Sequence, residues 1–283
     1  MQITNKLVSE SFSIEYSGKA LTTRETDYVN LDKIFDYCKQ IGETVYYDDN
    51  LYDTMVEDGI YLYEIIYGIK DGVSKDGADY LRELFGKSKK HPSADENAII
   101  IFCSCGEYSN EKISAAHTLS FYAKERQTYL KNIKNHADYG AFMKSCFPNC
   151  VFSTDCIKEL AHIKNFSDNV AEITACLSLL NEKALNLYRQ YSNDLSKAQA
   201  ILQSELHRTC APDPKHKKDL LFEFEYEIDK DNQRKTLHKT IECQPHFKLI
   251  RDNSNLRIYF FWKDDDIGNG KKVLIGRIGR HPW

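Results

Sequence analysis

The sequence lacks the features of a membrane or secreted protein. No apolar run approaches the roughly 20 residues that a membrane-spanning helix requires, and the first residues, MQITNKLVSESF, lack the basic-then-apolar order of a secretion signal. Methionine is also scarce, with 3 residues against 18 Tyr and 14 Phe, so we expect a core built largely on aromatic rings. These absences predict a cytoplasmic protein with no membrane partner.

Motifs for cofactors and metals are missing as well. The chain has no phosphate-cradling glycine loop, and its nine cysteines are an odd number spread along a long chain, which favours buried thiols over a disulfide framework. Zinc ligands usually come in closely spaced pairs, a pattern that is not matched by the spacing of Cys103, Cys105, Cys146, Cys150 and Cys156. A cysteine nucleophile paired with His117 or His162 is a weaker alternative. We therefore expect no cofactor and no metal.

Charge is distributed unevenly along the chain. The formal net charge is −4, but residues 245–283 carry eight Lys and Arg against four Asp, so this tail is +4 and the remainder is −8. A pI near 6.2 argues against overall attraction to nucleic acid. Any such binding would have to be local, and the tail is the place for it.

Hydrophobic periodicity predicts both helices and strands. Helical spacing and capping residues predict helices over residues 28–41, 60–69, 75–85, 111–134, 168–191 and 194–208, the last two as an antiparallel hairpin. Strand patterns cover residues 10–16, 98–104, 220–228, 237–250 with a break at Pro245, 256–262 and 272–279. We expect an α+β protein: an acidic mixed domain over 1–166, then a helical hairpin followed by an antiparallel sheet over 167–283.

The strand over 256–262 places a basic and aromatic set on one side. Its period of two sends Arg257, Tyr259, Phe261 and Lys263 to the same face. The next strand adds Arg277, with Arg280 and His281 near its end, and His246 and Lys248 precede on a neighbouring segment. Arginine beside exposed rings on a sheet is a composition that holds phosphates and stacks bases.

This C-terminal part resembles the RelE/ParE superfamily of bacterial toxins, including the HigB branch. The likeness covers at most residues 168–283 and lies in a helical hairpin followed by strands that read RIYFFW and KKVLIGRIG, with a late histidine. Members include ribosome-dependent mRNA endoribonucleases. By position in the strands, the resemblance implies that Arg257 and Arg277 hold phosphate, that Lys248 is a further phosphate contact and that His281 is the terminal acid or base. The family's proteins are much shorter, and the acidic N-terminal half has no counterpart in them.

We therefore expect a bacterial toxin or anti-phage defence effector that acts on RNA in the manner of a metal-independent endoribonuclease, with the ribosome or an antitoxin as further partners. The candidate catalytic residues are His281, His246, Arg277 and Arg257, and the candidate nucleic-acid contacts are Lys248, Arg251, Tyr259, Phe261 and Arg280. The competing interpretation is a non-enzymatic interaction module of a defence or toxin–antitoxin system. In a third interpretation, Glu223, Glu225 and Glu227 simply pair with Arg257 or Lys263 across one sheet.

Overall fold

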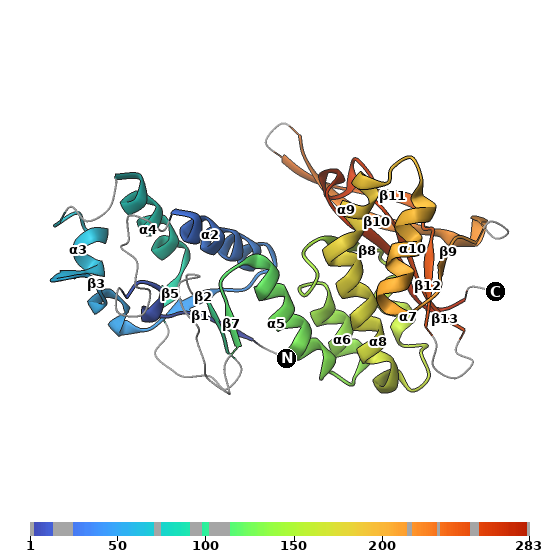
Figure 1. Cartoon of the computed structure of the whole chain (residues 1–283), viewed down its shortest axis with the longest axis horizontal. Coiled ribbons are helices and arrows are strands. Elements are labelled where there is room, and N and C mark those ends of the chain that lie inside the picture. The colour runs from blue at the N-terminus through green and yellow to red at the C-terminus, as the bar shows by residue number, and fades with distance from the viewer. Residues whose placement is uncertain are drawn as a thin grey trace. The chain divides into compact units, whose positions relative to one another are not determined.

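The computed structural model describes residues 3–13, 25–70, 75–90, 98–101, 114–213, 217–230, 233–249 and 255–281 (Figure 1). The chain has the expected α+β fold and divides into two compact units, Met1–Arg126 and Gln127–Trp283. The boundary that the sequence suggested, after residue 166, lies within the second unit. No helix in the described part of the chain is long and apolar enough to cross a membrane.

Unit 1 is built on a five-stranded parallel sheet. Its spatial order is β5-β2-β1-β6-β7, with bounds β1 Thr4–Leu7, β2 Val45–Tyr47, β5 Lys89–Lys90, β6 Ala98–Ile101 and β7 Ser114–Ala116. Parallel neighbours require crossover connections. Two of these connections carry helices: α2 (Glu25–Gln40) follows β1, and α4 (Lys75–Lys87) follows β2.

The connection from β2 to β5 also holds a small subdomain. It contains the strands β3 (Met55–Glu57) and β4 (Ile60–Tyr61) and the short helix α3 (Leu62–Ile66). Helix α5 (Leu119–Lys131) begins after β7 and continues past Arg126, the last residue of unit 1.

Several of the predicted elements of unit 1 are present with changed bounds. The helices expected over 28–41 and 75–85 are α2 and α4, and the helix expected over 60–69 is the shorter α3. The helix expected over 111–134 starts only at Leu119, because Ser114–Ala116 pairs with β6 as a strand. In place of a strand over 10–16, Ser9–Ser11 forms a 3₁₀ turn, and residues 14–16 lie outside the described part of the chain.

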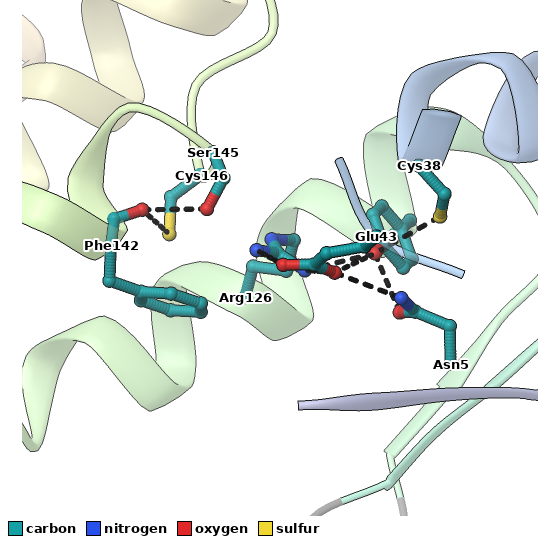
Figure 2. Close-up of polar contacts among 8 residues, drawn as sticks. Asn5, Cys38, Glu43, Arg126, Phe142, Ser145 and Cys146 are labelled. Carbon is teal, nitrogen blue, oxygen red and sulfur yellow. Dashed lines mark hydrogen bonds and ion pairs between the residues drawn. The ribbon is translucent and has the colours of Figure 1, made fainter. Parts of the chain in front are cut away.

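A buried ion pair fastens α5 to the sheet of unit 1 (Figure 2). The guanidinium of Arg126, which is fully buried, donates two hydrogen bonds of 2.7 Å to the carboxylate of Glu43, just before β2. Tyr122 Oη donates to Asn5 Oδ1 on β1 (2.6 Å) and accepts from Arg126 (2.9 Å) and from Cys38 Sγ on α2 (3.3 Å). Asn5 Nδ2 also donates to Glu43. The buried guanidinium thus has its counter-charge in the partly exposed carboxylate of Glu43.

Unit 2 begins with helices. They are α6 (His136–Met143), α7 (Cys156–Leu160), α8 (Phe166–Leu179), α9 (Leu185–Gln190) and α10 (Leu195–Leu206). At the end of α6, the carbonyl of Phe142 accepts hydrogen bonds from Ser145 Oγ and Cys146 Sγ (Figure 2). The predicted long helix is present as α8 and α9, joined through the π-helical turn Leu180–Ala184. In that turn the carbonyl of Asn181 accepts from Asn149 Nδ2 (3.0 Å), so the wider turn holds the chain that enters β8.

The sheet of unit 2 is mostly antiparallel. Its order is β8-β14-β13-β12-β9, with bounds β8 Cys150–Phe152, β9 Cys210–Ala211, β12 His246–Lys248, β13 Leu256–Phe261 and β14 Val273–Arg280. The pair β14–β8 is parallel, and the other three pairs are antiparallel. The β13–β14 register shifts between Tyr259 and Phe260. This β-bulge leaves Gly276 as the extra residue of β14.

The strand over 220–228 does not join this sheet, contrary to the sequence-based expectation. Within the described residues, β10 (Leu221–Lys230) and β11 (Gln233–Glu242) form a two-stranded sheet of their own. The glutamates Glu223, Glu225 and Glu227 pair in register with Thr240, His238 and Thr236 of β11, not with residues of β13. Strict alternation predicts an apolar face but does not fix which surface that face packs on.

The hairpin β10–β11 packs instead on one face of the main sheet. The shared core consists of Leu220, Phe222, Phe224, Ile241, Cys243, Tyr259, Ile267 and Leu274. Gly276 permits the close approach, because a Cβ atom there would lie 2.4 Å from a ring carbon of Phe222 and 2.7 Å from Cys243 Sγ. The face that the sequence suggested as an open working surface is therefore partly covered by the same chain.

Candidate functional site in the C-terminal sheet

Strand register brings several of the predicted site residues to one face of the main sheet. His246 on β12 lies opposite Tyr259 on β13, which lies opposite Arg277 on β14. In the next row, Lys248 is opposite Arg257. Directly opposed residues of antiparallel strands project from the same side of a sheet. Residues that are far apart in sequence therefore form two adjacent rows.

Three aromatic side chains meet at the first row. The ring centroids of His246 and Tyr259 are 4.9 Å apart, and the ring of His281 is 6.3 Å from His246 and 6.2 Å from Tyr259. His281 follows β14 directly, and its backbone N–H donates to the carbonyl of Asn255 (2.7 Å). That bond holds the end of the chain against the start of β13. Two candidate proton-transfer groups and a phenol thus converge.

Several polar atoms of His246, Tyr259 and the neighbouring Arg257 are buried without a hydrogen bond among the described residues. His246 is 3% exposed and Tyr259 is 0% exposed. Counting partners among the described residues, both ring nitrogens of His246, the hydroxyl of Tyr259 and Nε of Arg257 make no hydrogen bond. Each unsatisfied buried polar group costs about 1–3 kcal/mol. Native proteins bury few such atoms, and a concentration of them calls for a ligand, a water molecule or a catalytic role.

Burial also fixes the protonation states. It lowers the pKa of His246 to about 4, with a further contribution from the nearby cation Arg257. It raises the pKa of Tyr259 to about 12, although Arg257 opposes this shift. Burial lowers the pKa of Arg257 too, without removing its charge at neutral pH. At pH 7, His246 is therefore a neutral imidazole, Tyr259 is a protonated phenol and Arg257 is a guanidinium cation.

Asp213 is a member of the site that sequence reasoning missed. Its Oδ2 lies 3.4 Å from Nε2 of His281, and both side chains are largely buried, at 20% and 12% exposed. The backbone N–H of Asp213 donates to Oε1 of Gln244 (2.9 Å). The only signal in the sequence is that this aspartate stands between two prolines in the segment CAPDPKHKKD, a composition that is typical of a linker or exposed loop.

Arg277 is not the free cation that the sequence suggested. Its guanidinium forms an ion pair with Glu159 of α7 at 2.7 Å, and its Nε donates to the carbonyl of Arg280. The carboxylate neutralises the charge that was expected to hold phosphate. Helix α7 precedes β14 by more than a hundred residues, so no local sequence pattern predicts the ion pair between Glu159 and Arg277.

The remaining predicted contacts do not form one open surface. Lys248 and Arg280 are exposed, but alternation along β14 places Arg280 on the side opposite Arg277. Phe261 is partly buried against the hairpin core, and Tyr259 is covered by Phe222 at a ring distance of 6.2 Å. Neither ring is presented for stacking on a base. Arg251 lies outside the described residues.

The cysteine alternatives gain no support from the described residues. Cys146, Cys150 and Cys156 are buried, and burial raises the pKa of Cys156 to about 12, which opposes formation of a thiolate. Among the residues that the structure describes, no group of three or more His, Cys, Asp or Glu side chains is arranged to hold a metal ion. Cys103 and Cys105 lie outside them.

Comparison with known proteins leaves the site to be interpreted from its own geometry, since no family model, no curated protein and no solved structure matches the chain.

Proposed function

We propose that unit 2 of this cytoplasmic protein acts on RNA as a metal-independent endoribonuclease, in the role of a bacterial toxin or anti-phage effector. The observation that carries the proposal is the cluster of His246, Arg257 and Tyr259. Both ring nitrogens of His246, the hydroxyl of Tyr259 and Nε of Arg257 are buried without a partner among the described residues, whereas Nη1 of Arg257 donates to the carbonyl of Leu256. A phosphodiester group supplies oxygen acceptors for all of their N–H and O–H donors. Binding would thus satisfy groups that are costly to bury unpaired.

The chemistry requires a base, an acid and a cation. His281 takes the proton of the ribose 2′-hydroxyl as the 2′-oxygen attacks phosphorus, and the bond from phosphorus to the 5′-oxygen breaks. Arg257 stabilises the charge that builds on the non-bridging oxygens. Tyr259 is protonated at neutral pH, and burial raises its pKa further, to about 12. It protonates the departing 5′-oxygen because an alkoxide is more basic than a phenolate. His246 stays neutral and donates a hydrogen bond.

The proposed function requires RNA to reach side chains that are buried. His246 and Tyr259 are buried, whereas Lys248, in register with Arg257, is exposed. RNA would therefore meet Lys248 first, and the covered groups would engage only after the site opens. A need for opening fits a protein whose activity has to be restrained until it is triggered.

The second candidate is a module that binds RNA or a partner protein without cutting it. The exposure of Lys248 and the neutralisation of Arg277 by Glu159 favour this function, because surface cations alone suffice for binding. In that case the buried cluster would contribute to neither affinity nor cleavage.

Incubation of the purified full chain with total RNA in EDTA tests the two candidates. Cleavage to products with 2′,3′-cyclic phosphate and 5′-hydroxyl ends is expected. The rate should fall about 10²- to 10⁴-fold in His281→Ala and should also fall in Tyr259→Phe. The matched control Tyr188→Phe, whose ring packs on Trp262 away from the cluster, should cut like the wild type.

Intact RNA with salt-sensitive binding would favour the module instead. Cleavage that is equally fast in His281→Ala would reject the assignment of the site. Circular dichroism of each variant controls for folding.

A further inference from the structure

We propose that Asp213 is a positioning residue that fixes the tautomer of His281, leaving Nδ1 of His281 as the atom that takes the proton. The catalytic consequence rests on the proposed function. The pairing of the two side chains does not, and it is measurable without any substrate.

The geometry of the pair is held from both ends. Asp213 is fixed through its backbone N–H, which donates to Gln244 Oε1, and His281 through its backbone N–H, which donates to the carbonyl of Asn255. The chain on either side of Asp213 is restricted as well. Pro212 has a fixed φ, and the residue before Pro214 is biased toward extended conformations. The carboxylate is therefore presented to the imidazole by backbone that has little freedom.

The contact favours hydrogen on one of the two ring nitrogens. A carboxylate accepts hydrogen bonds, so Oδ2 of Asp213, at 3.4 Å from Nε2 of His281, favours the tautomer with hydrogen on Nε2. In that tautomer Nδ1 carries the lone pair and acts as the base. The same carboxylate stabilises the imidazolium that forms when Nδ1 takes a proton, as in other carboxylate–histidine pairs.

The other groups around His281 do not supply this function. His246 is neutral because burial lowers its pKa to about 4, and Tyr259 remains a phenol because burial raises its pKa to about 12. Arg257, on the neighbouring strand, is a cation and opposes a second positive charge. Arg277 is neutralised by Glu159. Among the residues that the structure describes, Asp213 is thus a carboxylate in contact with the ring.

The first test uses the unmodified chain. Long-range ¹H–¹⁵N correlation spectra distinguish the two neutral tautomers, and the His281 signals are identified by their loss in His281→Ala. Hydrogen on Nε2 at high pH is expected. Hydrogen on Nδ1 would overturn the proposal, whether or not the protein cleaves RNA.

The second test is the variant Asp213→Asn, with Asp265→Asn as its control. Asp265 is a highly exposed carboxylate of the same unit, paired with Lys263. In Asp213→Asn the midpoint of the His281 titration should fall by about one pH unit, and Asp213→Glu should recover part of the difference. An unchanged midpoint would overturn the proposal.

Kinetics then separate this proposal from the proposed function. If the chain cleaves RNA, Asp213→Asn should lower kcat at least tenfold with little change in KM, and the acid limb of the pH profile should move to lower pH. An unmoved acid limb would refute the catalytic role of the pair. If the His281 titration shifts in Asp213→Asn but the chain cuts no RNA, the pairing of Asp213 with His281 is supported and the endoribonuclease function is rejected.

Discussion

Each unit places an arginine beside a buried tyrosine, but the hydrogen bonds of the two pairs differ. In unit 1, Arg126 and Tyr122 are joined to Glu43 and Asn5 by hydrogen bonds between 2.6 and 2.9 Å. In unit 2, the hydroxyl of Tyr259 and Nε of Arg257 are buried and find no partner within the described residues. The first cluster is complete as it stands, and the second is incomplete.

The difference distinguishes a network that is complete without a ligand from one that has groups left to bind a ligand. A complete buried network leaves nothing for a ligand to bind, so the cluster around Arg126 serves to hold α5 against the sheet. An incomplete network costs stability and is retained at sites where something binds or reacts. Burial alone does not distinguish the two clusters, whereas counting partners does.

The largest effect is expected from breaking the complete cluster. Glu43→Gln leaves the guanidinium of Arg126 buried without its counter-charge, which should lower the free energy of unfolding by about 3 kcal/mol, the lower end of the usual range, because Glu43 is partly exposed. Denaturant unfolding measures the loss. The control Glu205→Gln removes an exposed partner of Lys183 and should cost less than about 1 kcal/mol. Equal losses in the two variants would contradict the comparison.

A smaller effect should come from acidification of the incomplete cluster. Burial lowers the pKa of His246 from 6.5 to about 4, so the unfolded chain binds a proton more readily than the folded one in this range. The stabilising contribution of the neutral imidazole is complete above pH 6.5 and is lost as the pH falls toward 4. At about 1.4 kcal/mol for each pH unit, the loss should reach about 2–3 kcal/mol.

Comparison of variants isolates this contribution from the carboxylates that titrate in the same range. His246→Leu should be less sensitive to acid than the wild type, while His238→Leu, which removes an exposed histidine, should behave like the wild type. Equal pH dependence in the wild type and His246→Leu would show that His246 is not held neutral.

The smallest effects come from a matched pair of single-atom deletions. Tyr122→Phe removes a hydroxyl that bonds Asn5, Arg126 and Cys38 and should cost about 1–2 kcal/mol. Tyr259→Phe removes a hydroxyl without a partner among the described residues and should be neutral or slightly stabilising. Thermal unfolding of the two variants side by side measures the contrast. A larger loss in Tyr259→Phe would mean that its hydroxyl is satisfied in solution.

The sequence predicted the helices and strands that are determined by the pattern of neighbouring residues. The apolar spacing along α2, α4 and α8 and the alternation along β13 and β14 are properties of adjacent residues, and the break at Pro245 separates β11 from β12 as expected. Short strands escaped this reasoning. In β1, Thr4–Leu7 is too brief to show a period, and its place in the middle of a parallel sheet depends on residues forty or more positions away.

Part of the candidate site was also predictable, because its residues follow the alternation of a strand. His246, Arg257, Tyr259 and His281 lie on or next to strands whose alternation is readable, so their shared face followed from the sequence. The partners that change their chemistry were not predictable. Asp213 and Glu159 reach the cluster through tertiary contacts, and Phe222 covers Tyr259 because the hairpin stacks on the sheet and does not extend it.

The stacking of the hairpin on the sheet limits which residues can replace Gly276 during evolution. Because a methyl group at this position would overlap both Phe222 and Cys243, the three positions are sterically linked. In any descendant of this chain, a larger residue at 276 should occur together with a smaller one at 222 or 243. Where that compensation is missing, the hairpin should sit further from the strand and leave the phenol of Tyr259 within reach of solvent.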